Sequence, residues 1–224
     1  MDGLPVYISF VFVVTVLLSI YFFYRACNKS IEATLLVFVW TAAQGFIALS
    51  GFYTDSNSIP PRLFLAVIPP LLLLAFLFFS RFGKGFIANL NPAYLCLIHT
   101  VRIPVELVLF WLFLEKKVPE LMTFEGRNFD ILSGLTAILI YYFGYKQNKL
   151  SRKILLIWNF ICLALLANIV IHAVLSAPFP FQQFAFEQPN IAVLYFPFEW
   201  LPACVVPIVL FAHLASIKQL LAAK

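Results

Sequence analysis

Long apolar runs separated by short polar segments make up the chain, and each run approaches the length of a membrane-spanning helix. About 20 consecutive apolar residues cross the hydrocarbon core of a bilayer as a helix. Windows of this kind predict seven spans in an all-α polytopic transmembrane bundle, a single domain over residues 1–224. The spans are expected near residues 5–24, 31–53, 63–80, 92–114, 129–145, 154–176 and 196–217.

Prolines interrupt three of these runs. Pro69 and Pro70 lie inside the third run, where they remove two amide donors and predict a kink. Pro104 does the same to the fourth, and the seventh contains Pro197, Pro202 and Pro207. The fourth and seventh spans are therefore expected to bend.

Composition supports the membrane interpretation. Hydrophobic residues make up 63% of the chain and charged residues 11%, against about 25% charged in a typical soluble domain. The first run lacks a preceding basic segment and a small-residue cleavage site, so it is interpreted as a span and not as a signal peptide. The net charge of +5 comes from residues in short loops, which indicates orientation in the bilayer and no nucleic-acid partner.

The distribution of basic residues predicts the orientation. Four basic loop residues, Arg62, Lys116, Lys117 and Arg127, fall on one side of the predicted bundle. Ten fall on the other: Arg25, Lys29, Arg81, Lys84, Lys146, Lys149, Arg152, Lys153, Lys218 and Lys224. The basic side is cytoplasmic by the positive-inside rule, so the N-terminus is expected outside and the C-terminus inside.

Three ionisable side chains, His99, Arg102 and Glu106, stand inside the fourth span. A charge at the centre of a span costs roughly 2.5–3.5 kcal/mol on insertion scales, so a compensating role is expected. Offsets of three and seven residues put them on one helical face, where Arg102 and Glu106 can pair directly. His99 is interpreted as structural unless His213 is its partner.

Polar residues of other spans reach a similar depth at about 1.5 Å per residue. We therefore predict one outward-facing ligand pocket, with Arg102 supplying an anion-pairing charge. An ion pair that only stabilises the bundle is the alternative. The predicted ligand-binding residues are Arg102, Glu106, Asn168, His172, Glu199, Trp200 and Gln44.

The segment 177–195 is rich in Phe and Pro, has few charges and shows no helical periodicity. Such a segment is expected to fold back over the outer end of the bundle as a lid, or to lie at the membrane interface.

No cofactor is predicted. A retinal protein needs a lysine deep within a span, and every lysine here lies near a loop or terminus. A haem between His99 and His213 is a less favoured alternative. The chain has no HExxH, GxSxG, P-loop or dinucleotide motif. Because its three histidines lie at different depths, a metal site would have to draw mainly on Glu106, His172 and Glu199. The four scattered cysteines suggest neither disulfides nor zinc.

Four segments, residues 99–115, 124–130, 177–190 and 195–202, resemble those of uncharacterised multi-span membrane proteins of environmental bacteria. The resemblance covers most of the second half of the chain. It implies a location in the bacterial cytoplasmic (inner) membrane and no assigned activity.

The leading hypothesis is a membrane protein that binds a small amphipathic or anionic molecule, as a carrier or as a binding and sensing protein. Its partners would be the lipid bilayer and a small-molecule or lipid ligand. One alternative is a membrane-embedded enzyme with a carboxylate and histidine site; we expect binding rather than catalysis. The other is an accessory subunit that pairs with another membrane protein.

Overall fold

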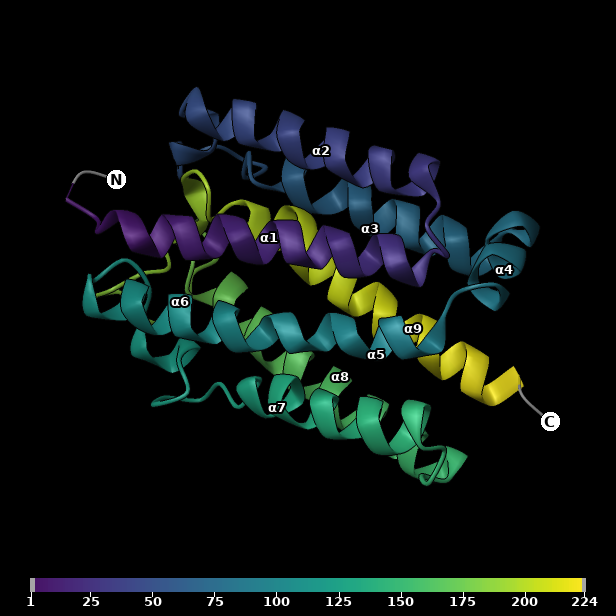
Figure 1. Ribbon diagram of the computed structural model, residues 1–224. Helices are drawn as coiled ribbons and strands as arrows, with labels where there is room; N and C mark the ends of the chain where they lie inside the picture. Colours follow the sequence, from purple (N-terminus) through teal and green to yellow (C-terminus); the bar gives the residue numbers. More distant parts are fainter. Residues whose placement is uncertain (1–2, 223–224) are drawn as a thin grey trace.

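Helices account for all the regular structure in residues 3–222, which are the residues that the computed structural model describes. Lys224, counted above among the basic residues, lies outside that range. Most of the α-helices run roughly along one common direction or its reverse, whereas α4 is turned across them, and the ends of the described chain lie on opposite sides in Figure 1. They are α1 (Val6–Ala26), α2 (Ile31–Leu49), α3 (Phe64–Phe79), α4 (Arg81–Ala88), α5 (Pro92–Ile98), α6 (Arg102–Leu114), α7 (Ile131–Ile140), α8 (Arg152–Leu175) and α9 (Val206–Ala222).

Five helical segments are long and apolar enough to cross a membrane: α1, α2, α5–α6 (Pro92–Leu114), α8 and Leu201–Ala222. A sixth is obtained if α3 and α4, which meet at 87°, count together as one broken span. The segment Ile131–Lys146, which continues α7 through the π-helical turn η4 (Tyr141–Lys146), is apolar but shorter. The bundle thus has the helices that a polytopic protein requires.

Two predicted spans differ at their ends from the helices in the structure. The second was expected to reach residue 53, but α2 stops at Leu49, and Gly51 with φ of 75° turns the chain into a short 3-10 turn, η1 (Phe52–Thr54). The seventh was expected from residue 196, but its helix starts at Leu201 with a π-helical turn, η6 (Leu201–Val205). Proline lacks the amide donor for a regular helix, which accounts for the irregular start around Pro202.

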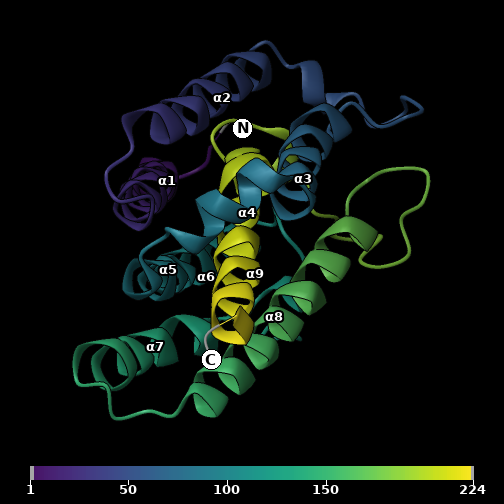
Figure 2. The same cartoon turned by 90° about the vertical axis from the view of Figure 1, so that its right-hand side faces the viewer.

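The core is built around the helical segment Leu201–Ala222, which consists of η6 and α9 and is called the α9 rod below. Of its most apolar stretch, 61% is buried, against 22% for α2 at the edge. Figure 2 shows α9 in the middle of the section, with α8 on one side and α5 on the other. Polar residues on α9 and its neighbours therefore meet inside the bundle.

The segment 177–195 contains one 3-10 turn, η5 (Ala192–Leu194), and is otherwise irregular. Phe179 packs into a cluster with Tyr53 and the start of α3, while Phe186 is 70% exposed. The Gln188 side chain donates to the Val118 carbonyl, in the connection that follows α6. The segment thus contacts the start of α3 through Phe179 and the connection after α6 through Gln188.

Candidate functional site

The helical segment Pro92–Leu114 contains a 3-10 turn at the residues that carry its ionisable groups. Pro104 has no amide donor for the carbonyl one turn earlier. The chain responds with a 3-10 turn, η2 (His99–Val101), between α5 and α6. His99, Arg102 and Glu106 all point inward, with exposed fractions of 0%, 3% and 1%. Three polar side chains on and beside this turn thus lie in the core.

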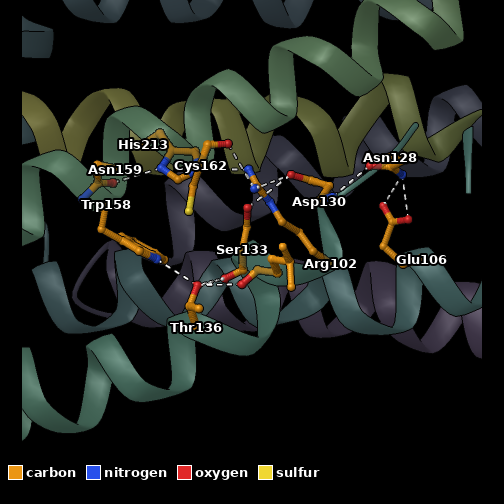
Figure 3. Close-up of polar contacts among 11 residues, drawn as sticks. Arg102, Glu106, Asn128, Asp130, Ser133, Thr136, Trp158, Asn159, Cys162 and His213 are labelled. Carbon is orange, nitrogen blue, oxygen red and sulfur yellow. Dashed lines mark hydrogen bonds and ion pairs between the residues drawn. The ribbon is translucent and has the colours of Figure 1, made fainter. Parts of the chain in front are cut away.

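Arg102 binds residues from three other segments of the chain (Figure 3). Its Nη1 donates to Asp130 Oδ1 at 2.7 Å and to the Cys162 carbonyl at 3.3 Å. Its Nη2 lies 2.9 Å from Nε2 of His213. The expected direct pairing with Glu106 is wrong, because Asp130, immediately before α7, is the carboxylate that the guanidinium reaches.

Glu106 is bound instead by Asn128, which lies in the connection before α7. The Asn128 Nδ2 donates to both carboxylate oxygens, at 2.7 and 2.6 Å, and to the Met122 carbonyl at 3.0 Å. Its Oδ1 accepts from the Asp130 amide at 3.0 Å. One asparagine therefore holds Glu106 and fixes the backbone at Asp130, so the two carboxylates belong to one network.

His213 extends the network toward the opposite end of the bundle. Asn159 donates through Nδ2 to the Leu155 carbonyl, so its Oδ1 faces His213 Nδ1 at 2.9 Å. Nδ1 must carry a proton to make that bond, which leaves Nε2 as the acceptor from Arg102. The contacts thus select a single neutral tautomer. Figure 3 shows the polar line from Asn159 through Arg102 to Glu106.

His99 stacks on His213. The ring centroids are 3.8 Å apart and the planes differ by 19°, and Trp158 packs edge-on against His99. His213 is therefore the partner that the sequence left open for His99. The two imidazole rings are in direct contact, with no other group between them.

The remaining predicted site residues lie elsewhere. Asn168 donates to the Arg127 carbonyl at 2.9 Å, and Nδ1 of the half-buried His172 lies 2.8 Å from the Asn168 carbonyl. Neither makes a hydrogen bond or ion pair with Arg102 or Glu106 among the described contacts. Similar depth in the membrane did not bring these groups together, because depth along a helix does not determine the direction in which a side chain points from the helix axis.

A second polar cluster contains Gln44, Glu199 and Trp200. The Trp200 Nε1 donates to the Thr41 carbonyl of α2 at 2.8 Å, and Gln44 accepts from the Tyr53 hydroxyl. Burial, together with the Glu199 carboxylate, raises the pKa of Tyr53 to about 12. Glu199 itself is fully buried, and neither carboxylate oxygen has a hydrogen-bond partner.

The residues expected to line one pocket thus fall into three groups: Arg102 with Glu106, Asn168 with His172, and Gln44 with Glu199 and Trp200. In residues 3–222, no three His, Cys, Asp or Glu side chains are arranged to hold a metal ion. Of the three residues named for a metal site, Glu106 is bound by Asn128, His172 lies beside the Asn168 carbonyl, and Glu199 lies in the cluster beside α2.

Four residues of the network were not among the predicted site residues: Asn128, Asp130, Asn159 and His213. The first two lie in a polar connection, where charged residues are normally solvated. Their signal was indirect: they belong to the segment 124–130 that resembles other membrane proteins. Asn159 and His213 are polar residues within spans and were detectable by that criterion alone.

Two adjacent cavities flank the network. A small one of about 50 Å³ is lined by Arg102, Glu106 and Asp130 and by apolar residues of α8 and the α9 rod. A larger one of about 390 Å³ lies between α3 and α8, with the α9 rod and the 177–195 segment in its lining. Five residues line both: Leu166, Val170, Ala173, Leu201 and Val206.

Comparison with known proteins finds a family but no activity. No curated protein and no solved structure matches the chain. A family model described as "Domain of unknown function (DUF8737)" matches residues 59–221, which is well over half of the chain and includes the whole network around Arg102. The chain therefore belongs to the DUF8737 family.

Proposed function

We propose that this protein is a multi-pass protein of the bacterial cytoplasmic membrane that binds an amphipathic, lipid-like molecule, as a carrier or as a binding and sensing protein. The apolar part of the ligand would occupy the cavity between α3 and α8. Its polar end would enter the small cavity beside Arg102 and Glu106. The wall shared by the two cavities is the observation that carries this proposal.

The proposed topology has seven spans, with the bent α3–α4 pair and Ile131–Lys146 as the third and fifth. The described basic residues at the end that holds α4 and the start of α8 outnumber those at the opposite end. This distribution supports a cytoplasmic location for that end and an external N-terminus. The 177–195 segment would then lie outside, where it lines part of the larger cavity.

The chemistry of the small cavity favours an uncharged polar group. The two Nη atoms of Arg102 are already bound and its charge is paired with Asp130, whereas its Nε has no partner. Glu106 has lone pairs beyond those that Asn128 uses. A ligand hydroxyl group could accept a hydrogen bond from Arg102 Nε and donate one to the Glu106 carboxylate. A volume of about 50 Å³ accommodates only a group of that size.

The test is to identify what remains bound when the full chain is purified in mild detergent. We expect mass spectrometry to find a stoichiometric amphipathic molecule on the wild-type protein. Val170→Trp would project a bulky ring into the two cavities from their shared wall. We expect it to lower the amount of bound molecule per protein at least tenfold. Ile171→Trp, on the lipid-facing side of the same helix at 54% exposed, is the matched control and should retain it.

Two outcomes contradict this function. One is a wild-type protein that retains no stoichiometric molecule and is not stabilised thermally by any lipid extract. The other is equal retention by Val170→Trp and Ile171→Trp, which would place the ligand outside the cavity.

A further inference from the structure

A third cavity lies at the basic end of the bundle, between the α3–α4 bend and the last turns of α9. Its volume is about 830 Å³ and it opens widely to the surroundings. Figure 2, which faces this end of the molecule, shows α4 beside α9. The lining is apolar apart from two lysines, Lys84 of α4 and Lys218 of α9.

The helix α4 has the properties of a segment that lies in a membrane interface. It leaves α3 at 87°, and the Ser80 hydroxyl caps its start by accepting from the Gly83 amide at 3.0 Å. Gly83 and Ile87 are buried against the bundle, whereas Phe82 is 71% exposed beside the exposed Arg81 and Lys84. Alternating apolar and basic side chains on an exposed short helix suit the boundary between acyl chains and headgroups.

Neither lysine has a carboxylate partner in the described residues, where the ion pairs are Arg62–Asp55 and Arg102–Asp130. The sequence contains no Asp or Glu from residue 56 to 105 or after Glu199, so both sides of the cavity lack negative charge. The Lys218 ammonium lies 5.1 Å from the ring centroid of Phe78 and 3.4 Å from its carbonyl oxygen. The cavity thus combines two unpaired cations with an apolar wall.

From this combination we propose that the cavity is a binding site for one anionic phospholipid. The phosphate would lie between Lys84 and Lys218, and an acyl chain would follow the apolar wall that includes Leu74, Phe78 and Leu214. A neutral lipid would leave both cations unpaired, and a soluble anion would leave the apolar wall empty. This site is separate from the binding site proposed above for the amphipathic ligand. It uses Lys84 and Lys218 instead of Arg102 and Glu106.

The experiment is a titration of the purified full chain, in detergent, with phosphatidylglycerol and separately with phosphatidylcholine, followed by native mass spectrometry. We expect one phosphatidylglycerol to bind in preference to phosphatidylcholine. The double variant Lys84→Gln/Lys218→Gln should bind it about 30-fold more weakly, since each lysine near an anionic headgroup contributes about fivefold. The matched control, Lys149→Gln/Lys153→Gln, removes two charges from the same end but outside the cavity and should bind normally.

A second variant tests the apolar wall. Leu214→Trp keeps both lysines but fills the cavity, so it should also weaken phosphatidylglycerol binding, by at least tenfold. Equal loss of phosphatidylglycerol affinity in the two double-lysine variants would overturn the site, because binding would then depend on general surface charge. Unchanged affinity of Leu214→Trp would overturn it as well, because the apolar wall would then not take part. Competition by glycerol phosphate alone would identify a soluble anion instead. Val170→Trp should leave this binding unchanged, which separates it from the first ligand.

Discussion

At the scale of single residues, the most consequential contact is the ion pair between Arg102 and Asp130. Both side chains are almost fully buried, so each charge depends on the other for compensation. Removing one partner of a buried pair leaves an isolated charge, whereas an exposed pair is already compensated by water. The chain contains both kinds, since Arg62 and Asp55 form an exposed pair at 2.7 Å.

We therefore expect Asp130→Asn to lower the free energy of unfolding by about 3–5 kcal/mol. Asp55→Asn is the control and should cost no more than about 1 kcal/mol. Thermal unfolding of both variants in the same detergent measures the difference. Equal effects would show that Asp130 is solvated in the folded protein.

The two buried glutamates should respond differently to neutral replacement. Glu199 has no hydrogen-bond partner, so Glu199→Gln removes an uncompensated carboxyl group and should leave thermal stability unchanged or higher. Glu106 accepts from Asn128 through both oxygens, so Glu106→Gln would place one amide donor against another and cost about 1–3 kcal/mol. Unfolding midpoints of the two variants test this. A larger loss for Glu199→Gln than for Glu106→Gln would refute the assignment.

At the scale of elements, α7 packs closely against the 3-10 turn η2 between α5 and α6. A Cβ on Gly134 of α7 would lie 2.8 Å from Ile103 Cγ1 and 3.3 Å from the His99 carbonyl oxygen. Only glycine allows this approach without displacement of the neighbours. Within the first turn of α7, Ser133 donates to Asp130 Oδ1 at 3.3 Å.

Gly134→Ala is expected to destabilise the fold by about 1–3 kcal/mol, because the added methyl group must displace Ile103 or the broken turn. Gly85→Ala is the control, since no atom lies within 4 Å of its added methyl group and alanine favours helix. It should be neutral or stabilising by up to about 1 kcal/mol. Chemical or thermal unfolding compares them, and a neutral Gly134→Ala would mean that α7 packs less closely.

At the scale of the whole molecule, the distribution of basic residues predicts which end faces the cytoplasm. The four native cysteines are buried, so single introduced cysteines can report the orientation. In intact bacterial cells, an impermeant maleimide should label Glu125→Cys, in the connection before α7. Lys149→Cys, between η4 and α8, should react only after permeabilisation. The reverse pattern would invert the proposed topology.

Much of the architecture could be predicted from the sequence, and the sites only in part. Apolar runs and their prolines located the helices, because length and composition decide whether a segment can be buried in hydrocarbon. Depth along each span identified Arg102 and Glu106 as unusual, but depth does not specify the direction in which a side chain points. Asn168 and His172 were grouped with Arg102 on depth and lie outside its network.

The sequence by itself determined that the chain forms apolar helices and that a charged stretch must be compensated inside one of them. The tertiary structure decided the compensating groups: Asp130 and Asn128 from a connecting segment, and His213 from the last helix. The physical reason is that the cost of burying Arg102 is local to that residue. The groups that offset the cost come from helices whose neighbours are set by packing of the whole bundle.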